Sequence, residues 1–247
     1  MDLLRGVTER QALISHAVAK GLNPDAPMKP SGVEWLGDVP AHWKEHRLGY
    51  LVDMVSGSTP DKAVPEYWTG SISWISPKDL KSEHISDSED HISEAAVREW
   101  GMKLIPPRAV LVVVRGMILA HTFPVGLTTI PTTINQDMKA LLPKCGCTPE
   151  FLAALLRGRE GLMLSYIDDA AHGTKCLRTD RWKGMKIFLP SVAEQGAICD
   201  WIAETGSQMD AVIAKVHQSI ALMREHRTAL ISAAVTGKVD VREFNHA

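Results

Sequence analysis

The chain has 247 residues, enough to bury a sizeable core and more than one domain usually needs, without clearly requiring two full domains. Its composition, 45% hydrophobic and 23% charged, is that of an ordinary globular protein, and no apolar run approaches the roughly 20 residues that span a bilayer. Because the formal net charge is −2, any nucleic-acid site must be a local basic patch.

The N-terminus and the cysteines predict a cytoplasmic protein. Met1–Arg5 contains no basic stretch followed by an apolar stretch, as a secretion signal would, and the chain has only 4 cysteines. The Cys145–Cys147 spacing is narrower than in zinc sites, and no second pair of ligands is placed to complete it. His42 and His46 are four residues apart but lack a third ligand, so we expect no metal in this chain.

Residues 1–22 are predicted to form a short N-terminal helix that contains one copy of an internal repeat. Arg10–Val18 reads RQALISHAV, Arg227–Val235 reads RTALISAAV, and seven of the nine positions are identical. An offset of 217 residues is too long for a solenoid. The repeat therefore predicts that the same helical element stands before and after a globular insert.

Residues 23–47 are predicted to be an extended connector docked onto the rest of the chain. Prolines exclude a continuous helix, and three large apolar residues are its expected anchors. The prolines are Pro24, Pro27, Pro30 and Pro40, and the anchors are Trp35, Leu36 and Trp43.

Residues 48–191 are predicted to be a globular domain of mixed α/β structure. Ser71–Ile75 and Ala109–Val114 have the composition of strands, whereas Ile92–Trp100 and Pro149–Arg157 are typical of helices. Overall we expect the α+β class: this mixed domain, a short helix before it and a long helix after it.

Residues 192–238 are predicted to form that long helix, which ends at Thr236–Lys238 and leaves 239–247 as a tail. Its apolar residues recur at intervals of three or four, which predicts a coiled-coil seam for another long helix. A helix packed against its own domain remains the alternative. The predicted pairing residues are Met209, Ile213, Val216, Ile220, Met223 and Leu230, with Ala234 beyond them.

No pattern in the chain indicates catalysis. It contains no phosphate-binding loop, no glycine-rich turn for a cofactor and no pocket motif for a flipped base. Asn135–Asp137 is polar, but it is followed by apolar residues and fits a turn entering a buried strand.

The segment 172–186 is the first candidate for DNA contact. It sets Lys175, Arg178, Arg181, Lys183 and Lys186 against a single acid, Asp180. Gly173 would let the backbone approach a phosphate, Thr174 could donate to it, and arginine can read guanine in the major groove. A solvated basic loop is the structural alternative.

Further candidates are spread over the domain. Ser58 and Thr59 lie in a loop with small hydroxyl residues, although ordinary turn chemistry explains the loop equally well. Lys78 and Arg115 each follow an expected strand and could project from its end. Residues 83–99 contain six acidic residues against one arginine and should face away from phosphates.

Several of these motifs occur in an order that resembles the specificity subunits of type I restriction-modification enzymes. Residues 31–43, SGVEWLGDVPAHW, are similar to the lead-in of a target-recognition domain, and GSTP at 57–60 followed by YWTG at 67–70 is similar to its first half. The succession continues through Arg115-Gly116, Asn135–Asp137, Gly173-Thr174, Leu189-Pro190, Glu194-Gln195, Glu225–Arg227 and residues 233–242.

The resemblance implies a sequence-specific DNA-binding subunit that is not itself an enzyme. It reads one half of a bipartite double-stranded target, and its long helix fixes the spacing and docks methyltransferase subunits. Those partners would hold S-adenosylmethionine, and separate restriction (translocase) subunits would hold ATP and magnesium. Full subunits of the family have two recognition domains, so this chain resembles a half-length form, which can be a natural half subunit, a split-gene product or a truncated fragment.

Two copies of such a half subunit could pair their helices antiparallel and generate a two-fold axis. The alternative function is an interaction protein that assembles or inhibits a restriction complex through the coiled-coil helix without binding DNA. A stand-alone hydrolase is a third hypothesis, for which no nucleophile or acid-base pair stands out.

Overall fold

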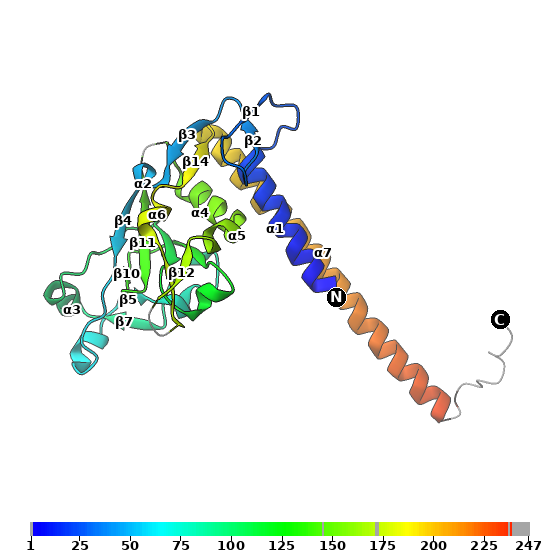
Figure 1. The fold of residues 1–247 in the computed structure, drawn as a ribbon. Helices are drawn as coiled ribbons and strands as arrows, with labels where there is room; N and C mark the ends of the chain where they lie inside the picture. Colours follow the sequence, from blue (N-terminus) through cyan, green and yellow to red (C-terminus); the bar gives the residue numbers. More distant parts are fainter. Residues whose placement is uncertain (1, 145, 171–172, 237, 239–247) are drawn as a thin grey trace. The chain divides into compact units, whose positions relative to one another are not determined.

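The computed structural model describes residues 2–144, 146–170, 173–236 and 238. The chain divides into two compact units, and Figure 1 colours it from one terminus to the other. The larger unit is Gln11–Ile202, and the helical unit combines Met1–Arg10 with Ala203–Ala247. The N-terminal helix α1 (Asp2–Lys20) and the long helix α7 (Val192–Val235) each run from one unit into the other.

The predicted fold class is confirmed: a mixed α/β body with a short helix before it and a long helix after it. The two segments with strand composition form strands, and the two with helical composition form helices. The remaining α-helices are α2 (Leu48–Leu51), α3 (Glu94–Glu99), α4 (Pro149–Gly158), α5 (Glu160–Leu164) and α6 (Thr179–Trp182). The 3-10 helices are η1 (Pro65–Trp68), η2 (Pro77–Asp79) and η3 (Met117–Ala120).

A five-stranded sheet forms the centre of the larger unit, with the order β4-β11-β8-β9-β6. Neighbouring strands are antiparallel except β6 and β9, which run parallel. The strands are β4 (Val52–Ser56), β11 (Met138–Pro143), β8 (Val110–Val113), β9 (Val125–Thr128) and β6 (His84–Ile85). Strand β8 is buried along its whole length, as its VLVV sequence predicts for a central strand.

Smaller sheets complete the larger unit. A three-stranded sheet has the order β10-β5-β7, and three two-stranded sheets pair β1 with β2, β3 with β14 and β12 with β13. Their bounds are β10 (Thr133–Ile134), β5 (Ile72–Ile75), β7 (Asp90–Ile92), β1 (Met28–Pro30), β2 (Asp38–Pro40), β3 (Lys44–Arg47), β14 (Lys186–Leu189), β12 (Ile167–Asp169) and β13 (Lys175–Leu177). The predicted connector therefore includes three short strands.

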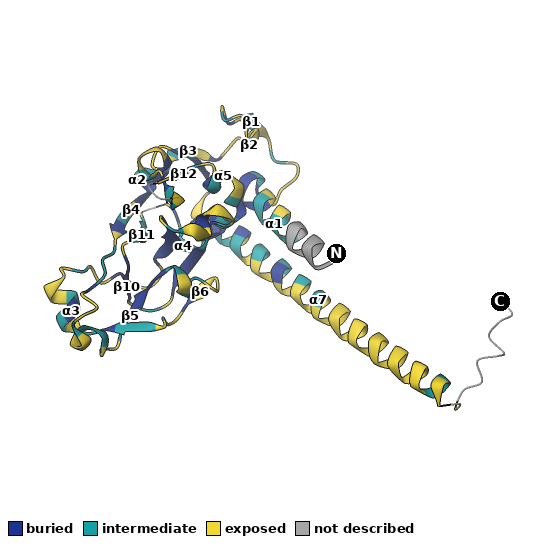
Figure 2. Cartoon of the chain, turned by 60° about the horizontal axis from the view of Figure 1, so that its bottom comes forward, coloured by how far each residue is buried: buried dark blue, intermediate teal, exposed yellow. Residues whose placement is uncertain are grey.

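The main core lies between the five-stranded sheet and helix α4, which packs over β8, β9 and β11 (Figure 1). Helix α4 begins at Pro149 after the cap Thr148, whose hydroxyl accepts a hydrogen bond from the backbone N–H of Phe151. Figure 2 shows the buried residues concentrated in these layers. Burying this apolar surface is the main stabilising contribution to the fold.

Helix α1 packs against α4 at Gly158, which provides the space for it. A β-carbon at position 158 would lie 2.9 Å from Val18 Cγ2 and 3.1 Å from Ile14 Cγ2, which is closer than normal contact. The N-terminal copy of the repeat is thereby part of the core of the larger unit, and Ala17 and Val18 are each 1% exposed.

Two adjacent residues at the start of α7 form a polar joint. The Glu194 carboxylate accepts a hydrogen bond from Trp43 Nε1 at 3.0 Å, and its other oxygen lies 2.8 Å from His42 Nε2. Gln195 is fully buried, and its side-chain oxygen accepts from the backbone N–H of Thr148 at 2.8 Å. The joint ties the connector and the start of α4 to the start of α7.

The same Gln195 amide also satisfies two backbone carbonyls. Its nitrogen donates to the Gly146 carbonyl at 2.7 Å and to the Pro190 carbonyl at 3.1 Å. A buried amide with all these partners is stabilising, whereas the loss of the side chain would leave several buried backbone groups without hydrogen bonds.

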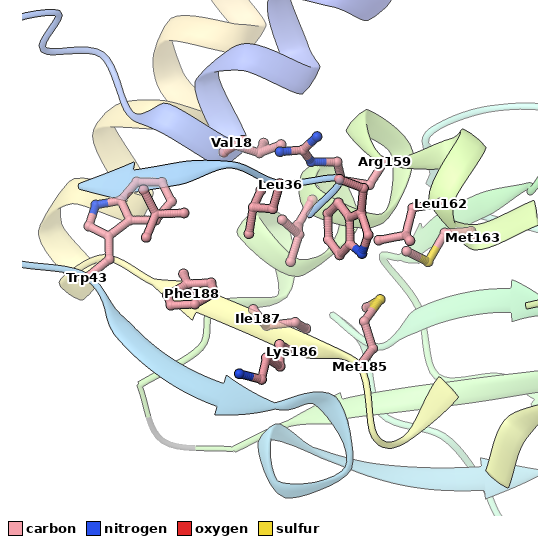
Figure 3. Close-up of a pocket in the computed structure, with 14 residues that line it drawn as sticks. Val18, Leu36, Trp43, Arg159, Leu162, Met163, Met185, Lys186, Ile187 and Phe188 are labelled. Atoms are coloured by element: carbon pink, nitrogen blue, oxygen red, sulfur yellow. The ribbon is translucent and has the colours of Figure 1, made fainter. Parts of the chain in front are cut away.

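The lead-in residues Trp35 and Leu36 close a small cavity between α1, the α4–α5 junction and β14 (Figure 3). The cavity measures about 30 Å³, which is room for about two water molecules and far below the roughly 300 Å³ of small-molecule sites. Arg159 lies over the Trp35 ring with its Cζ 5.6 Å from the ring centroid. We interpret the cavity as a packing space where the connector contacts the rest of the larger unit.

Within the described residues, no helix combines the length and the apolar character that crossing a membrane would require.

We expect the substitution Gln195→Ala to destabilise the protein by roughly 3 kcal/mol, because buried N–H and C=O groups lose their partner. Urea unfolding followed by circular dichroism measures the change. The control is Gln208→Ala in the same helix, where the exposed amide donates to Glu204; its effect should stay within about 0.5 kcal/mol. Equal unfolding midpoints for the two variants would contradict the assigned role of Gln195.

Candidate nucleic-acid interface

Four segments that are distant in the sequence form a continuous row in the larger unit. The Ser58 backbone N–H donates to the Ile134 carbonyl at 3.1 Å, and the Thr59 hydroxyl donates to the side-chain oxygen of Gln136. The next residue, Asp137, accepts from the backbone N–H of Arg115 at 3.2 Å. The loop after β4, the turn before β11 and the end of β8 are thus joined.

The hairpin of strands β12 and β13, called the basic hairpin below, completes this row. Arg115 forms a β-bridge with Cys176, and the Gly116 N–H donates to the Lys175 carbonyl at 3.0 Å. The row therefore brings together three of the predicted contact groups: Ser58 and Thr59, Arg115, and the segment that begins at Gly173. Gly173 has a φ of 75°, a left-handed conformation that suits glycine.

A glycine makes the loop after β4 possible. A β-carbon on Gly57 would lie 1.9 Å from the Ile134 carbonyl oxygen and 2.4 Å from the Asn135 carbonyl oxygen. The backbone of the Ser58 loop lies directly on β10 for this reason. The turn at Asn135 is itself held by its side chain, which accepts from the Asp137 N–H at 3.0 Å, so the turn interpretation of this motif is confirmed.

The segment 172–186 is not a simple loop, because it contains strand β13 and helix α6. Strand β12 pairs with β13 and brings Asp168 and Asp169 beside the cations. Lys175 Nζ lies 2.6 Å from Asp169 Oδ1, and Arg178 Nη1 lies 3.0 Å from Asp168 Oδ2. With Asp168 and Asp169 added to Asp180, the five cations of the segment stand against three aspartates, an excess of two instead of the four counted along the sequence.

Hydrogen bonds with two aspartates hold Arg178 in place. Bonds to Asp180 and to Asp168 raise the pKa of the Arg178 guanidinium, and the bond from Arg178 lowers the pKa of the Asp180 carboxyl. These groups are solvent-exposed, where ion pairs contribute little to stability. A phosphate or a guanine base could therefore replace the aspartates at small cost.

The other cations of this segment differ in their partners. Lys186 lies in β14, 3.0 Å from Glu45 Oε1. Arg181 and Lys183 form no ion pair with any residue that the structure describes, and both are exposed. Thr174 lies between Gly173 and β13, and its carbonyl accepts from the Ala170 N–H at 2.7 Å.

Lys78 lies in helix η2, and its pKa is raised by hydrogen bonds with Asp90 and Glu89 of the acidic stretch. Its Nζ lies 2.8 Å from Asp90 Oδ2 and 3.2 Å from Glu89 Oε2. These two carboxylates offset the charge of Lys78, so it is the weakest of the predicted contacts.

Sequence reasoning missed Lys139, which lies in β11 opposite Ser56 of β4. Its Nζ donates to the Ser56 hydroxyl at 2.8 Å, next to the Ser58 loop. Burial, with a smaller contribution from the charge of Lys183, lowers the pKa of the Lys139 ammonium. The signal in the sequence is a single lysine within the apolar run MKALL.

The predicted pairing residues of α7 lie in the helical unit, where Met209 and Ile213 are partly buried. Val216, Ile220, Met223 and Leu230 are exposed, as Figure 2 shows for the C-terminal part of α7. Between Met209 and Ile213, Asp210 of α7 forms an ion pair with Arg10 of α1, with 3.6 Å between Arg10 Nη1 and Asp210 Oδ1. From Val216 onward, the predicted pairing residues are therefore uncovered in the part of the chain that the structure describes.

The two copies of the repeat lie in different surroundings. In α1, Val18 is 1% exposed, and Ile14 is packed against the core. The equivalent residues of α7 are Val235, which is 81% exposed, and Ile231, which is 54% exposed. An apolar pattern that is buried in one copy is thus left open to solvent in the other.

No group of three or more metal-ligating side chains occurs among the described residues. Cys145 lies outside those residues. Burial raises the pKa of the Cys147 thiol to about 12, so this sulfur stays protonated at neutral pH. His42 is bound to Glu194, and His46 lies in strand β3 rather than on a helix with His42.

Comparison with known proteins gives a consistent result. Residues 40–220 match the family model of the type I restriction modification DNA specificity domain. The chain is 34% identical over 159 residues to the type I restriction enzyme EcoR124I/EcoR124II specificity subunit of Escherichia coli, a match that covers 64% of this chain and 39% of that protein. It is 29% identical over 195 residues to the MjaIX specificity subunit of Methanocaldococcus jannaschii, covering 73% of this chain and 43% of that one.

Solved structures share the fold. The HsdS subunit from Thermoanaerobacter tengcongensis superposes with a TM-score of 0.64 at 17% identity, covering 96% of this chain and 53% of that one. A chain from a structural study of complex assembly and conformational transition in the type I R-M system gives a TM-score of 0.67 at 17% identity, covering 94% and 53%. This chain spans about two fifths of the length of the curated relatives.

We expect Gly57→Ala to distort the row, because the new methyl group would collide with two backbone carbonyls. The cost should be roughly 2 kcal/mol, as for other overpacked positions, and appears as a lower midpoint of thermal unfolding. Gly161→Ala is the matched control: it lies in helix α5, and apart from that helix's own backbone nothing lies within 4 Å of the added carbon. A midpoint unchanged by Gly57→Ala would contradict the close approach of the loop to β10.

Proposed function

This chain belongs to the type I restriction modification DNA specificity family, and on that premise we propose that it binds double-stranded DNA and reads one half of a bipartite target. The row of segments around Arg115 and β13 supports this, because it exposes arginine, lysine, threonine and glutamine side chains that suit phosphate and base contacts. The larger unit is then one target-recognition domain.

The observation that carries the half-target proposal is the different burial of the two repeat copies. Ile14 and Val18 fill the notch at Gly158 of α4, whereas Ile231 and Val235 present the same apolar residues to solvent. A segment with the same sequence can make the same contact, so the second copy is suited to dock on a second recognition domain. That domain would come from another copy of this chain or from another chain.

We propose that the apolar seam of α7 docks other helices. The exposed Val216, Ile220 and Met223 would be covered by methyltransferase subunits or by an antiparallel α7 of a second copy. In this proposal the chain supplies no catalytic residue. S-adenosylmethionine would be held by the methyltransferase subunits, and ATP with magnesium by the restriction subunits.

The alternative is an assembly protein that uses the helix but does not bind DNA. The two aspartates beside Lys175 and Arg178 favour it, since they reduce the positive charge of the hairpin. Specific DNA binding by the assembled complex separates the two functions. Methylome mapping in cells that carry the complete system would identify the target.

We expect the triple substitution of Lys175, Arg178 and Arg181 by Ala to weaken target binding by the assembled complex about tenfold or more, because each good base contact contributes about 1–3 kcal/mol. Fluorescence anisotropy with the mapped target duplex measures it. The control replaces three cations in and around the acidic segment 83–99, namely Lys81, Arg98 and Lys103. This variant should keep specific binding within about twofold of the wild type. Unchanged binding by the first variant would exclude the hairpin from the interface.

We expect Ile231→Asp and Ile14→Asp to act differently although they alter equivalent positions. Ile14→Asp puts a carboxylate into the α1–α4 contact and should cost roughly 3 kcal/mol of stability. Ile231→Asp should leave the thermal midpoint of the free chain nearly unchanged but reduce assembly. Light scattering on the purified chain and on its mixture with methyltransferase subunits measures assembly, and wild-type assembly by Ile231→Asp would contradict the docking role.

A further inference from the structure

The proposed DNA-binding row includes two exposed apolar side chains. Met117 is 62% exposed and Ile118 is 38% exposed, and both lie in the 3-10 helix η3 directly after Arg115-Gly116. We call Met117 and Ile118 the apolar pair. A single exposed apolar residue is normal on a protein surface. The surroundings of the apolar pair, and not its exposure alone, therefore have to indicate what it contacts.

Hydrogen bonds place η3 beside the basic hairpin. The Gly116 N–H donates to the Lys175 carbonyl at 3.0 Å, and the preceding Arg115 forms a β-bridge with Cys176. Arg115 is exposed, and an exposed arginine can read the edge of a base. Only Gly116 separates this arginine from Met117, so an apolar and a cationic side chain are presented next to each other.

Side-chain packing also joins η3 to helix α6. Phe123, which follows η3, is 2% exposed, and its ring centroid lies 6.0 Å from that of Trp182. Trp182 is fully buried and stands between Arg181 and Lys183, which are exposed and form no ion pair with any described residue. Helix η3 is therefore attached to both elements that carry cations of the proposed interface, β13 and α6.

The scaffold holds η3 in a defined position. Leu119, in the middle of η3, is 2% exposed and belongs to the main core. The Glu160 carboxylate accepts from the Thr122 hydroxyl at 2.5 Å and from the Phe123 N–H at 2.9 Å, which fixes the chain after η3. Gly116, with a φ of 143°, has a backbone conformation that is essentially restricted to glycine. The apolar pair is thus presented on a fixed support, as specific recognition requires.

We propose that Met117 contacts the C5 methyl group of a thymine in the major groove of the bound DNA, with Ile118 beside it as a second apolar surface. The inference rests on the proposed DNA-binding function and adds to it a residue that reads an A·T base pair. Thymine is favoured because its methyl group is the only one on the major-groove edges of the four bases. The unbranched methionine side chain adapts readily to such a group.

Two other occupants of the apolar pair are less favoured. Exposed apolar side chains can also be inserted between base pairs, but such wedges act from the minor groove. Arg115, directly before the pair, suits the major groove, where arginine reads guanine through two hydrogen bonds. A protein surface is the second alternative, and the cations of β13 and α6 favour an anionic partner such as DNA over it.

The test uses the assembled complex and the mapped target duplex, in which thymines are replaced one at a time by deoxyuridine, which lacks only the C5 methyl group. We expect one position at which the replacement weakens binding by the wild-type complex about fourfold, the equivalent of about 0.8 kcal/mol for one buried methyl-sized group. The variant Met117→Ala should bind the thymine duplex about fourfold more weakly and should not respond to deoxyuridine at that position. Fluorescence anisotropy measures both.

Control variants separate this contact from other effects. Met28→Ala removes a methionine side chain that is 42% exposed from β1 and should keep binding within about twofold of the wild type. Met117→Leu remains apolar and should retain most of the response to deoxyuridine. Met117→Ala should leave binding to a duplex without the target, and the slope of log K against log salt, unchanged, because the contact involves no phosphate.

The outcomes are distinguishable. If the wild-type complex binds its target but no position responds to deoxyuridine, or if Met117→Ala responds as the wild type does, the methyl contact is wrong and the proposed function stands. Equal weakening of target and non-target binding by Met117→Ala would also overturn the contact. Reduced assembly of this variant with methyltransferase subunits, measured by light scattering, would make the apolar pair a protein contact instead. If the wild-type complex does not bind DNA specifically, the proposed function itself fails.

Discussion

The buried amide of Gln195 is the interaction on which the arrangement of the larger unit depends. It accepts from the N–H of Thr148, the cap of α4, and donates to the carbonyls of Gly146 and Pro190. Its neighbour Glu194 accepts from the Trp43 indole. The first turn of α7 is thereby fixed to the connector and to the helix that covers the sheet. A hydrogen-bonded joint is directional, which apolar packing alone is not.

The sequence predicts those features that depend on local pattern. The strands around Ile75 and Leu111, the long α7 and the turn at Asn135 follow from periodicity and composition. Charge pairing does not follow, because strand β12 contributes Asp168 and Asp169 to a basic segment only after the hairpin forms. A count of charges along the chain therefore overestimates the positive charge of the folded hairpin.

Lys139 illustrates a second limit of sequence reasoning. Within the run MKALL, the alternation of side chains between the two faces of a strand would place the lysine on the face opposite its neighbours. From the sequence alone this indicates an edge or surface position. Only the pairing of β11 with β4 shows that its ammonium meets the Ser56 hydroxyl, 83 residues earlier in the chain. Contacts between segments so far apart cannot be inferred from local spacing.

The two kinds of cation in the larger unit suit different tasks. Arg178 and Lys175 already have aspartate partners, so a phosphate bound there would exchange one ion pair for another, with little net gain in affinity. Such an exchange is favourable only where the incoming group matches the geometry of the guanidinium, which favours discrimination between sequences. Arg181 and Lys183 have no carboxylate to release among the described residues, so a phosphate would add to their stabilisation without a competing loss. An interface built from both kinds can bind firmly through the second and select its sequence through the first.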